Sequence, residues 1–169
     1  MKTVMLILFF LLLLLSGCTH GSQDAEQIKA TIRRYDQLLT EGYANLNMNP
    51  LQEVATSDQA QKDYFHMAAL GEGRVRMLAK LTDISFSSVD FPKKGEATIT
   101  THETWDFAYV DIKSGKKESE VKGFVYQLRY ELKKEGKRWI IRNVTALNND
   151  EKTVPPSRRI IPSKDPRRP

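Results

Sequence analysis

Hydrophobic residues recur along the first part of the chain at the spacing of an α-helix. From Asp24 onward the apolar positions step by three or four residues, which places them in one stripe. The charged positions between them, Asp36 included, are predicted to face solvent. The pattern ends before Pro50, which suits the first turn of a short second helix over 51–55. The stripe consists of Ile28, Ile32, Tyr35, Leu39, Tyr43 and Leu46.

A third helix is predicted to begin at Ser57, because serine is a favourable N-cap residue. Gly71 and Gly73 weaken its pattern, so this helix either ends there or bends and continues toward Lys80. The residues that we expect to face the core are Tyr64, Phe65, Ala68 and Ala69.

After Leu81 the hydrophobic period changes to two, which is typical of β-strands. A first strand is predicted over 84–91, with a turn at 93–95, and a long second strand follows over 96–110. The second strand has one mainly apolar face that we expect to line the core. This face consists of Ala97, Ile99, Thr101, Glu103, Trp105, Phe107 and Tyr109.

Two more strands complete a predicted antiparallel meander. A hairpin tip at 113–117 leads into a strand that alternates cleanly, and a turn at 134–137 leads into the last strand, over 138–147. Three helices followed by such strands indicate the α+β class, with the helices packed on a long, bent sheet in the shape of a cone. The inward face of the alternating strand is Phe124, Tyr126, Leu128, Tyr130 and Leu132.

The end of this pattern resembles a known superfamily. Residues 130–141 read YELKKEGKRWII, which is similar to the nuclear-transport-factor-two-like, cystatin-like cone proteins. Within that superfamily, the order of elements over 24–147 is similar to the intermembrane-space domain of cyanobacterial and plastid division proteins. The resemblance implies a cone fold, whose function must be argued from its own site residues.

The first 18 residues have the features of a leader. Lys2 precedes an apolar run over 4–15, which as a helix spans about 18 Å and is too short to cross a bilayer. A short apolar run after a positive charge is typical of a secretory signal peptide. The run ends in Leu15-Ser16-Gly17-Cys18, which resembles the lipobox of bacterial lipoproteins.

The lipobox resemblance implies that Cys18 is acylated, as in palmitate-bearing anchors, and becomes the mature N-terminus. The domain plan is then a cleaved signal peptide (1–17), a lipidated N-terminus and linker (18–23), a cone domain (24–148) and a tail (149–169). We expect an extracytoplasmic protein that is lipid-anchored to a bacterial cell membrane. The alternatives are a secreted protein with an incidental cysteine and an uncleaved anchor.

Charge separates the tail from the body. The chain carries 26 Lys and Arg against 21 Asp and Glu, and residues 151–169 hold six of the basic residues and only two of the acidic ones. The neutral body argues against nucleic-acid binding. The proline-rich tail is predicted to be disordered and either to contact an anionic envelope surface or to act only as a solubilising end. Its candidate contact residues are Arg158, Arg159, Arg167 and Arg168.

Candidate catalytic residues are few. Some cone-fold enzymes place an acid inside an apolar cone beside a tyrosine donor, and Glu103 with Tyr126 or Tyr130 could form such a pair. The alternative is that Glu103 forms an ion pair or lies at an open rim. The histidines fall in separate elements, so we expect no metal and no cofactor.

The favoured function at this stage is a binding or assembly module of the cell envelope. The outward sheet face, which includes His102 and Arg129, could bind a partner or a second copy of the chain; it could also be plain solvated surface. The alternative function is a small-molecule-binding protein, or an isomerase- or dehydratase-like enzyme, that uses the cone pocket.

Overall fold

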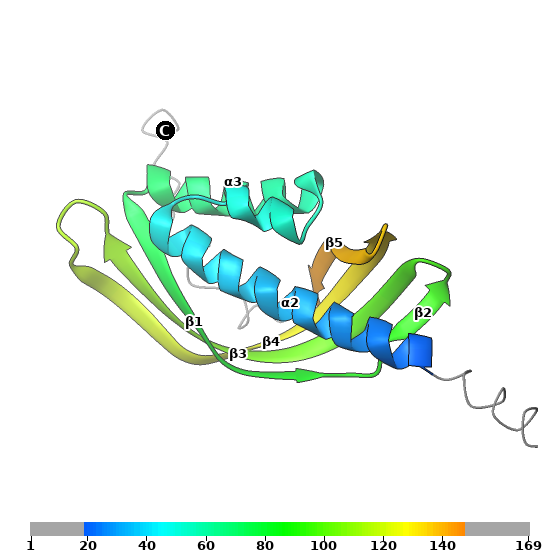
Figure 1. Cartoon of the computed structure of the whole chain (residues 1–169). Coiled ribbons are helices and arrows are strands. Elements are labelled where there is room, and N and C mark those ends of the chain that lie inside the picture. Colours follow the sequence, from blue (N-terminus) through cyan, green and yellow to red (C-terminus); the bar gives the residue numbers. More distant parts are fainter. Residues whose placement is uncertain (1–18, 148–169) are drawn as a thin grey trace, which may run out of the picture.

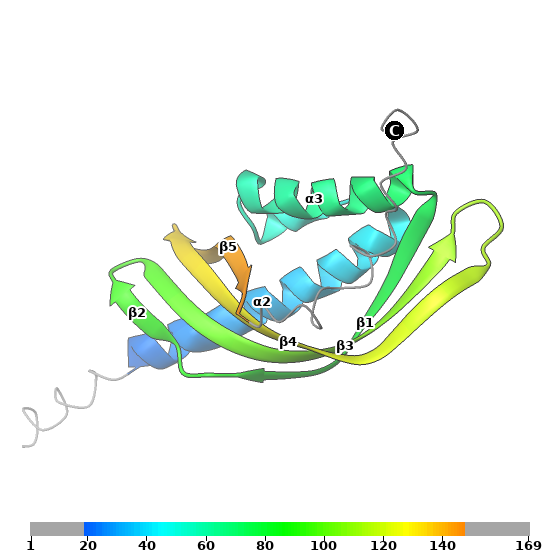
Figure 2. The same cartoon turned by 180° about the vertical axis from the view of Figure 1, so that it is seen from behind.

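The computed structural model describes residues 19–147 as a curved antiparallel sheet with two α-helices on its concave face (Figures 1 and 2). The α+β prediction is confirmed. The leader, Cys18 and the tail with its four arginines lie outside the described residues. The elements are α2 (Thr19–Asn45), the 3-10 helix η2 (Asn49–Glu53), α3 (Ser57–Glu72), β1 (Val75–Phe86), β2 (Asp90–Lys93), β3 (Glu96–Asp111), β4 (Lys117–Glu135) and β5 (Arg138–Ala146).

The prediction of three helices is wrong, because the segment after Pro50 forms only the 3-10 turn η2. α2 begins at Thr19, five residues before its predicted start. Its buried stripe includes most of the predicted positions, but Leu46 is 37% exposed. Leu46 follows the end of α2 with a φ of 55°, so it leaves the helical stripe. Leu38 is buried in the core instead.

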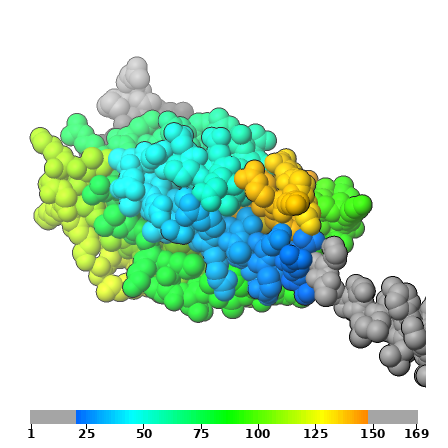
Figure 3. Space-filling model, viewed as in Figure 1, coloured from blue at the N-terminus to red at the C-terminus, as the bar shows by residue number. Residues whose placement is uncertain are grey.

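The N-cap of α3 is Thr56 and not the predicted Ser57, because the Thr56 side-chain oxygen accepts a hydrogen bond from the backbone N–H of Gln59. The predicted inward position of its aromatic pair is wrong, because Tyr64 and Phe65 are 49% and 59% exposed. α3 lies over only one end of the sheet, beside α2 (Figure 3). It therefore buries a narrow stripe, which consists of Gln59, Ala60, Met67 and Leu70.

The five-stranded sheet has the order β1-β3-β4-β5, with β2 also paired to β3. β3 and β4 are long, and their pairing shifts register between Trp105 and Phe107. On β4 this point is occupied by Gly123, whose φ is 63° and whose N–H donates to Asp106 Oδ1 at 2.8 Å. A bulge with a left-handed glycine bends a strand, and this bend lies within the curved part of the sheet.

β1 begins at Val75, well before the first strand predicted at residue 84. It follows α3 almost directly, through Arg74 with a φ of 60°. The inward faces of β3 and β4 agree with the sequence pattern: Thr101, Glu103 and Tyr130 are each at most 1% exposed. Within residues 19–147 no helix is apolar and long enough to span a membrane.

Candidate functional site

A cavity of about 290 Å³ lies between the concave face of the sheet and the two helices. It extends to the exposed residues Lys62 of α3 and Ala146 of β5, so it has a route to the surface. Its volume is at the small end of the range for ligand pockets, roughly 300–1,000 Å³. Aromatic side chains form much of the wall, and they are Tyr35, Tyr43, Trp105, Phe107, Tyr109, Tyr126 and Tyr130.

Glu103 lies at the buried end of this cavity and is held by three donors. Its Oε1 accepts hydrogen bonds from the Thr101 hydroxyl at 2.6 Å and from the Tyr130 hydroxyl at 2.9 Å. Its Oε2 accepts one from the Trp105 indole N–H at 2.9 Å. Thr101, Glu103 and Trp105 alternate along β3, so the strand period itself aims all three inward. The tyrosine comes from the neighbouring strand β4.

Asp36 of α2 faces the same cluster and is 2% exposed. Its Oδ1 lies 3.3 Å from the Tyr130 hydroxyl oxygen, and its Oδ2 has no hydrogen-bond partner among the described residues. Burial, followed by the negative charge of Glu103, raises the pKa of Asp36 well above its usual value. Tyr130 has one hydroxyl proton and can donate to only one of the two carboxyls. The shorter contact indicates that this hydroxyl donates to Glu103, and the raised pKa of Asp36 favours its protonated form.

A second polar group joins the two helices beside the cavity. The Tyr35 hydroxyl donates to Asp63 Oδ2 at 2.7 Å, and the Gln59 amide donates to the same tyrosine oxygen at 3.0 Å. Burial raises the pKa of Asp63, although these two donors act in the opposite direction. Tyr43 and His66 also contact across the helices, with 2.5 Å between the hydroxyl and Nδ1.

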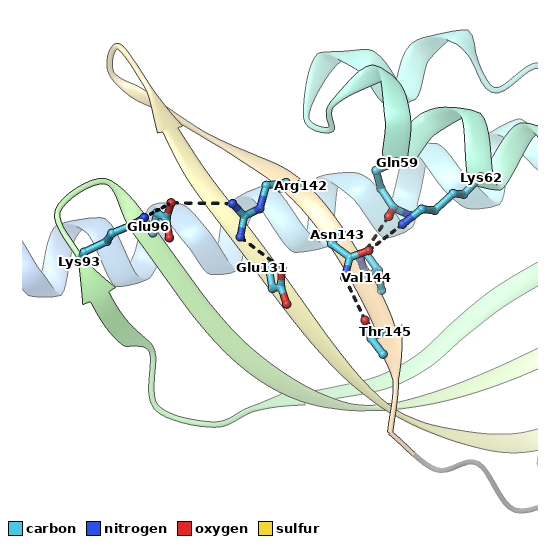
Figure 4. A network of polar contacts seen from close by, with 9 residues as sticks. All are labelled: Gln59, Lys62, Lys93, Glu96, Glu131, Arg142, Asn143, Val144 and Thr145. Atoms are coloured by element: carbon cyan, nitrogen blue, oxygen red, sulfur yellow. Dashed lines mark hydrogen bonds and ion pairs between the residues drawn. The ribbon is translucent and has the colours of Figure 1, made fainter.

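Two residues of α3 fix this helix to the last strand (Figure 4). Gln59 Oε1 accepts a hydrogen bond from the Val144 N–H at 3.1 Å, and the Lys62 amine donates to Asn143 Oδ1 at 2.7 Å. Both α3 residues also line the cavity. The contacts hold the mouth in shape, and they keep the lysine at the rim.

The structure places the candidate residues as follows. Glu103 and Tyr126 are paired positions of β3 and β4, and both line the cavity. Burial raises the pKa of the Tyr126 phenol, which keeps it a neutral donor. His102 and Arg129 are exposed on the outward face. They are diagonal neighbours on β3 and β4, because His102 pairs with Gln127 and Arg129 pairs with Thr100. No cluster of metal-ligating side chains occurs within the described part of the chain.

The prediction that Asp36 faces solvent is wrong. The sequence does indicate burial: Asp36 stands four residues after Ile32 and seven before Tyr43, so helical spacing places it in the buried stripe. Its charge argued for solvent, because carboxylates are seldom buried without a partner. The structure resolves this conflict by placing Asp36 beside Tyr130 and raising its pKa.

The Asp36→Asn substitution is expected to change how stability depends on pH. The raised pKa means that the folded state binds this proton more tightly than the unfolded state. The resulting stabilisation is complete below the unfolded pKa of about 3.9 and is lost as pH rises through the folded pKa, by at most about 1.4 kcal/mol per pH unit. The free energy of unfolding of the wild type, relative to the variant, should therefore fall as pH rises.

Urea denaturation of both proteins at a series of pH values measures this difference. Asp63, whose pKa is also raised, is present in both proteins, so its contribution cancels. A difference that stays constant with pH would show that Asp36 titrates alike in the folded and unfolded states.

No family model and no curated protein matches this sequence. Among solved structures, the intermembrane space region of chloroplast protein ARC6 matches with a TM-score of 0.60 at 13% identity, over 72% of this chain and 95% of that chain. An uncharacterised Caulobacter vibrioides protein with a cystatin-like fold matches with a TM-score of 0.43 at 18% identity, over 83% and 99% of the two chains.

An NTF2-like protein with a cystatin-like fold from Novosphingobium aromaticivorans matches with a TM-score of 0.42 at 16% identity, over 83% of this chain and 90% of that chain. At these identities the likeness concerns the fold alone. The predicted similarity to the intermembrane-space domain is confirmed at that level. The activity must be argued from the residues around the cavity.

Proposed function

We propose that this chain is a lipid-anchored, extracytoplasmic binding module of a bacterial cell envelope, and that its cone holds a small, mainly apolar molecule. The observation that carries the proposal is the aromatic-walled cavity with Glu103, Tyr130 and Asp36 at its buried end. A largely apolar pocket with a few convergent polar groups is the usual form of a small-molecule site.

The start of α2 supports the anchoring part of the proposal. α2 begins at Thr19, the residue after Cys18, so little chain separates the proposed lipid from the domain. A depression near this end is lined by Lys93, Lys94 and Lys134 together with Phe91. Lys93 and Lys134 form ion pairs with Glu96 and Asp24, so attraction to an anionic bilayer comes mainly from Lys94 and contributes about 1 kcal/mol. This end of the domain is therefore suited to lie against lipid headgroups.

An isomerase- or dehydratase-like reaction receives less support from the same geometry. A general base must reach a substrate proton, and Glu103 is instead occupied by three hydrogen bonds from the protein. Tyr130, which could serve as an oxyanion donor, instead donates its hydrogen bond to that carboxylate. The arrangement stabilises a buried negative charge, which suits binding better than proton abstraction.

A second candidate function is assembly with another protein through the outward face of the sheet. Leu78 and Val125 are 41% and 50% exposed there, and the exposed residues His102 and Arg129 lie on the central strands β3 and β4. Exposed apolar side chains among polar ones are common at transient interfaces. A dimer or complex that Val125→Glu dissociates would favour this candidate.

Filling the cavity tests the first proposal. Ala79 lines the cavity, whereas Ala108, whose opposite partner on β1 is Leu78, is not among the residues that line it. Ala79→Phe is expected to weaken binding of the neutral probe 2-phenylethanol at least about tenfold, because its ring occupies the same space. Ala108→Phe should bind as the wild type does, by isothermal titration calorimetry.

Circular dichroism of both variants would establish that each is folded. Equal binding by the two variants would place the probe elsewhere and would contradict the proposal.

A further inference from the structure

We propose that the cavity selects a small organic cation, a protonated amine carried on an apolar body. This inference rests on the proposed binding function and adds the charge of the ligand. It follows from three features of the described residues: an excess of hydrogen-bond acceptors, an unpartnered carboxyl oxygen and walls made of aromatic rings.

The buried end of the cavity has more acceptors than donors. The Glu103 carboxylate offers about four acceptor positions, and the Asp36 carboxyl adds further acceptor positions even when it holds a proton. The protein supplies three donors there, the hydroxyls of Thr101 and Tyr130 and the indole N–H of Trp105. A ligand that donates hydrogen bonds therefore finds partners, while a ligand that only accepts them does not.

The Oδ2 atom of Asp36 is the clearest sign of a missing donor. It is buried and has no hydrogen-bond partner among residues 19–147. Leaving a buried polar atom unpaired costs about 1–3 kcal/mol. Such an atom beside a cavity marks the place where a ligand group would gain most by binding. An ammonium group donates to it and also compensates the negative charge of the neighbouring Glu103.

The nearby basic side chains are engaged in other contacts. The Lys62 amine donates to Asn143 Oδ1 at the rim, and the Arg33 guanidinium lies over the Phe86 ring, 4.6 Å from its centroid. Neither side chain forms an ion pair with Asp36 or Glu103, although the charge of Arg33 lowers the pKa of Asp36 to a small extent. The positive charge that would balance this end of the cavity is thus left for a ligand to supply.

Aromatic rings favour the same ligand class. Trp105, Phe107 and Tyr126 lie along one wall, and Tyr43 lines the cavity from α2. The faces of such rings attract cations by about 0.5–2 kcal/mol when water is excluded. An anionic ligand would meet repulsion from both the ring faces and Glu103. The volume of about 290 Å³ accommodates a single substituted ring or a short branched chain.

Three probes of matched shape test the inference: 2-phenylethylamine, 2-phenylethanol and phenylacetate. Calorimetric titration of the purified protein at neutral pH is expected to rank their affinities in the order amine, alcohol, acid. The amine should bind at least about tenfold more tightly than the acid. Because an ammonium group favours the ionised form of Asp36, whose pKa is raised, amine binding should tighten as pH rises for as long as the amine stays protonated.

The Asp36→Asn variant identifies the responsible group. It should weaken amine binding about tenfold and alter alcohol binding by less than about threefold. Glu41→Gln, on an exposed residue of the same helix, removes one negative charge away from the cavity and should leave both affinities unchanged. Thermal unfolding of each variant shows that differences in affinity do not reflect loss of fold.

The outcomes separate this inference from the proposed function. If the alcohol or the acid binds as tightly as the amine, or if Asp36→Asn leaves amine binding unchanged, the cation inference is overturned while the cavity remains a binding site. If none of the three probes binds at about 10 mM, a level at which weak fragments are detected, the proposed small-molecule function fails together with it.

Discussion

Glu103→Leu is expected to lower the free energy of unfolding by at least about 3 kcal/mol, because each buried donor left without an acceptor costs about 1–3 kcal/mol. The leucine side chain has similar size but accepts no hydrogen bond, so the buried donors of Thr101, Trp105 and Tyr130 lose their shared partner. The cost of such orphaned donors exceeds the gain from burying a more apolar side chain. Removing the charge next to Asp36 offsets only part of this loss.

Urea denaturation followed by circular dichroism measures the effect. Glu118→Leu is the matched control, because Glu118 is an exposed residue of β4, and it should change stability by no more than about 0.5 kcal/mol. Glu103→Gln keeps one acceptor oxygen, so its free energy of unfolding should lie between those of Glu103→Leu and Glu118→Leu. A Glu103→Leu protein as stable as the control would show that the three hydrogen bonds do not organise the buried end of the cavity.

Cys18→Ser is expected to move the protein from the membrane fraction to the soluble fraction almost completely. Each buried methylene of an acyl chain contributes about 0.8 kcal/mol to membrane binding, so two or three chains hold a protein firmly and their loss leaves only weak electrostatic attraction. Incorporation of labelled palmitate, which requires the Cys18 thiol, is expected to be lost as well. Cell fractionation and incorporation of labelled palmitate measure the two effects.

Thr19→Ser, at the next residue, is the control and should leave both the membrane association and the labelling unchanged. Continued membrane association of unlabelled Cys18→Ser protein in high salt would argue for an uncleaved anchor. Complete absence of labelling in the wild type would argue that the lipobox resemblance is incidental.

The sheet was the part most readily predicted from the sequence. In β3 and β4 one face is buried, so apolar and polar residues alternate strictly in the sequence. The inward position of Glu103 followed from Thr101 and Trp105, which stand two residues away on either side. The bulge at Gly123 interrupts that period locally. The start of β1 was predicted too far along the chain, at residue 84 instead of Val75. Its inward residues Val75 and Met77 follow directly on the glycines that weaken the pattern of α3.

The helices were harder, because their buried faces include polar residues. In α3 the buried stripe steps by three, four and three through Ala60, Asp63, Met67 and Leu70. The Asp63 carboxyl made this stripe look polar, and the adjacent Tyr64 and Phe65 suggested that another face of the helix is buried. On α2 the charge of Asp36 led in the same way to the wrong prediction that this residue faces solvent. Asp36 is buried and Asp63 is partly buried where α2 and α3 meet the cavity, so the residues that were hardest to predict belong to the candidate site.

The most direct test of the cavity as a ligand site uses the two tryptophans of the chain. The Trp105 indole N–H donates to Glu103 beside the cavity, whereas that of Trp139 donates to Asp24 Oδ1 at 3.1 Å, away from it. In a proton–nitrogen NMR titration with 2-phenylethylamine, the Trp105 signal should shift saturably while the Trp139 signal stays in place. A shift of Trp139 alone, or no shift of either signal, would contradict the account.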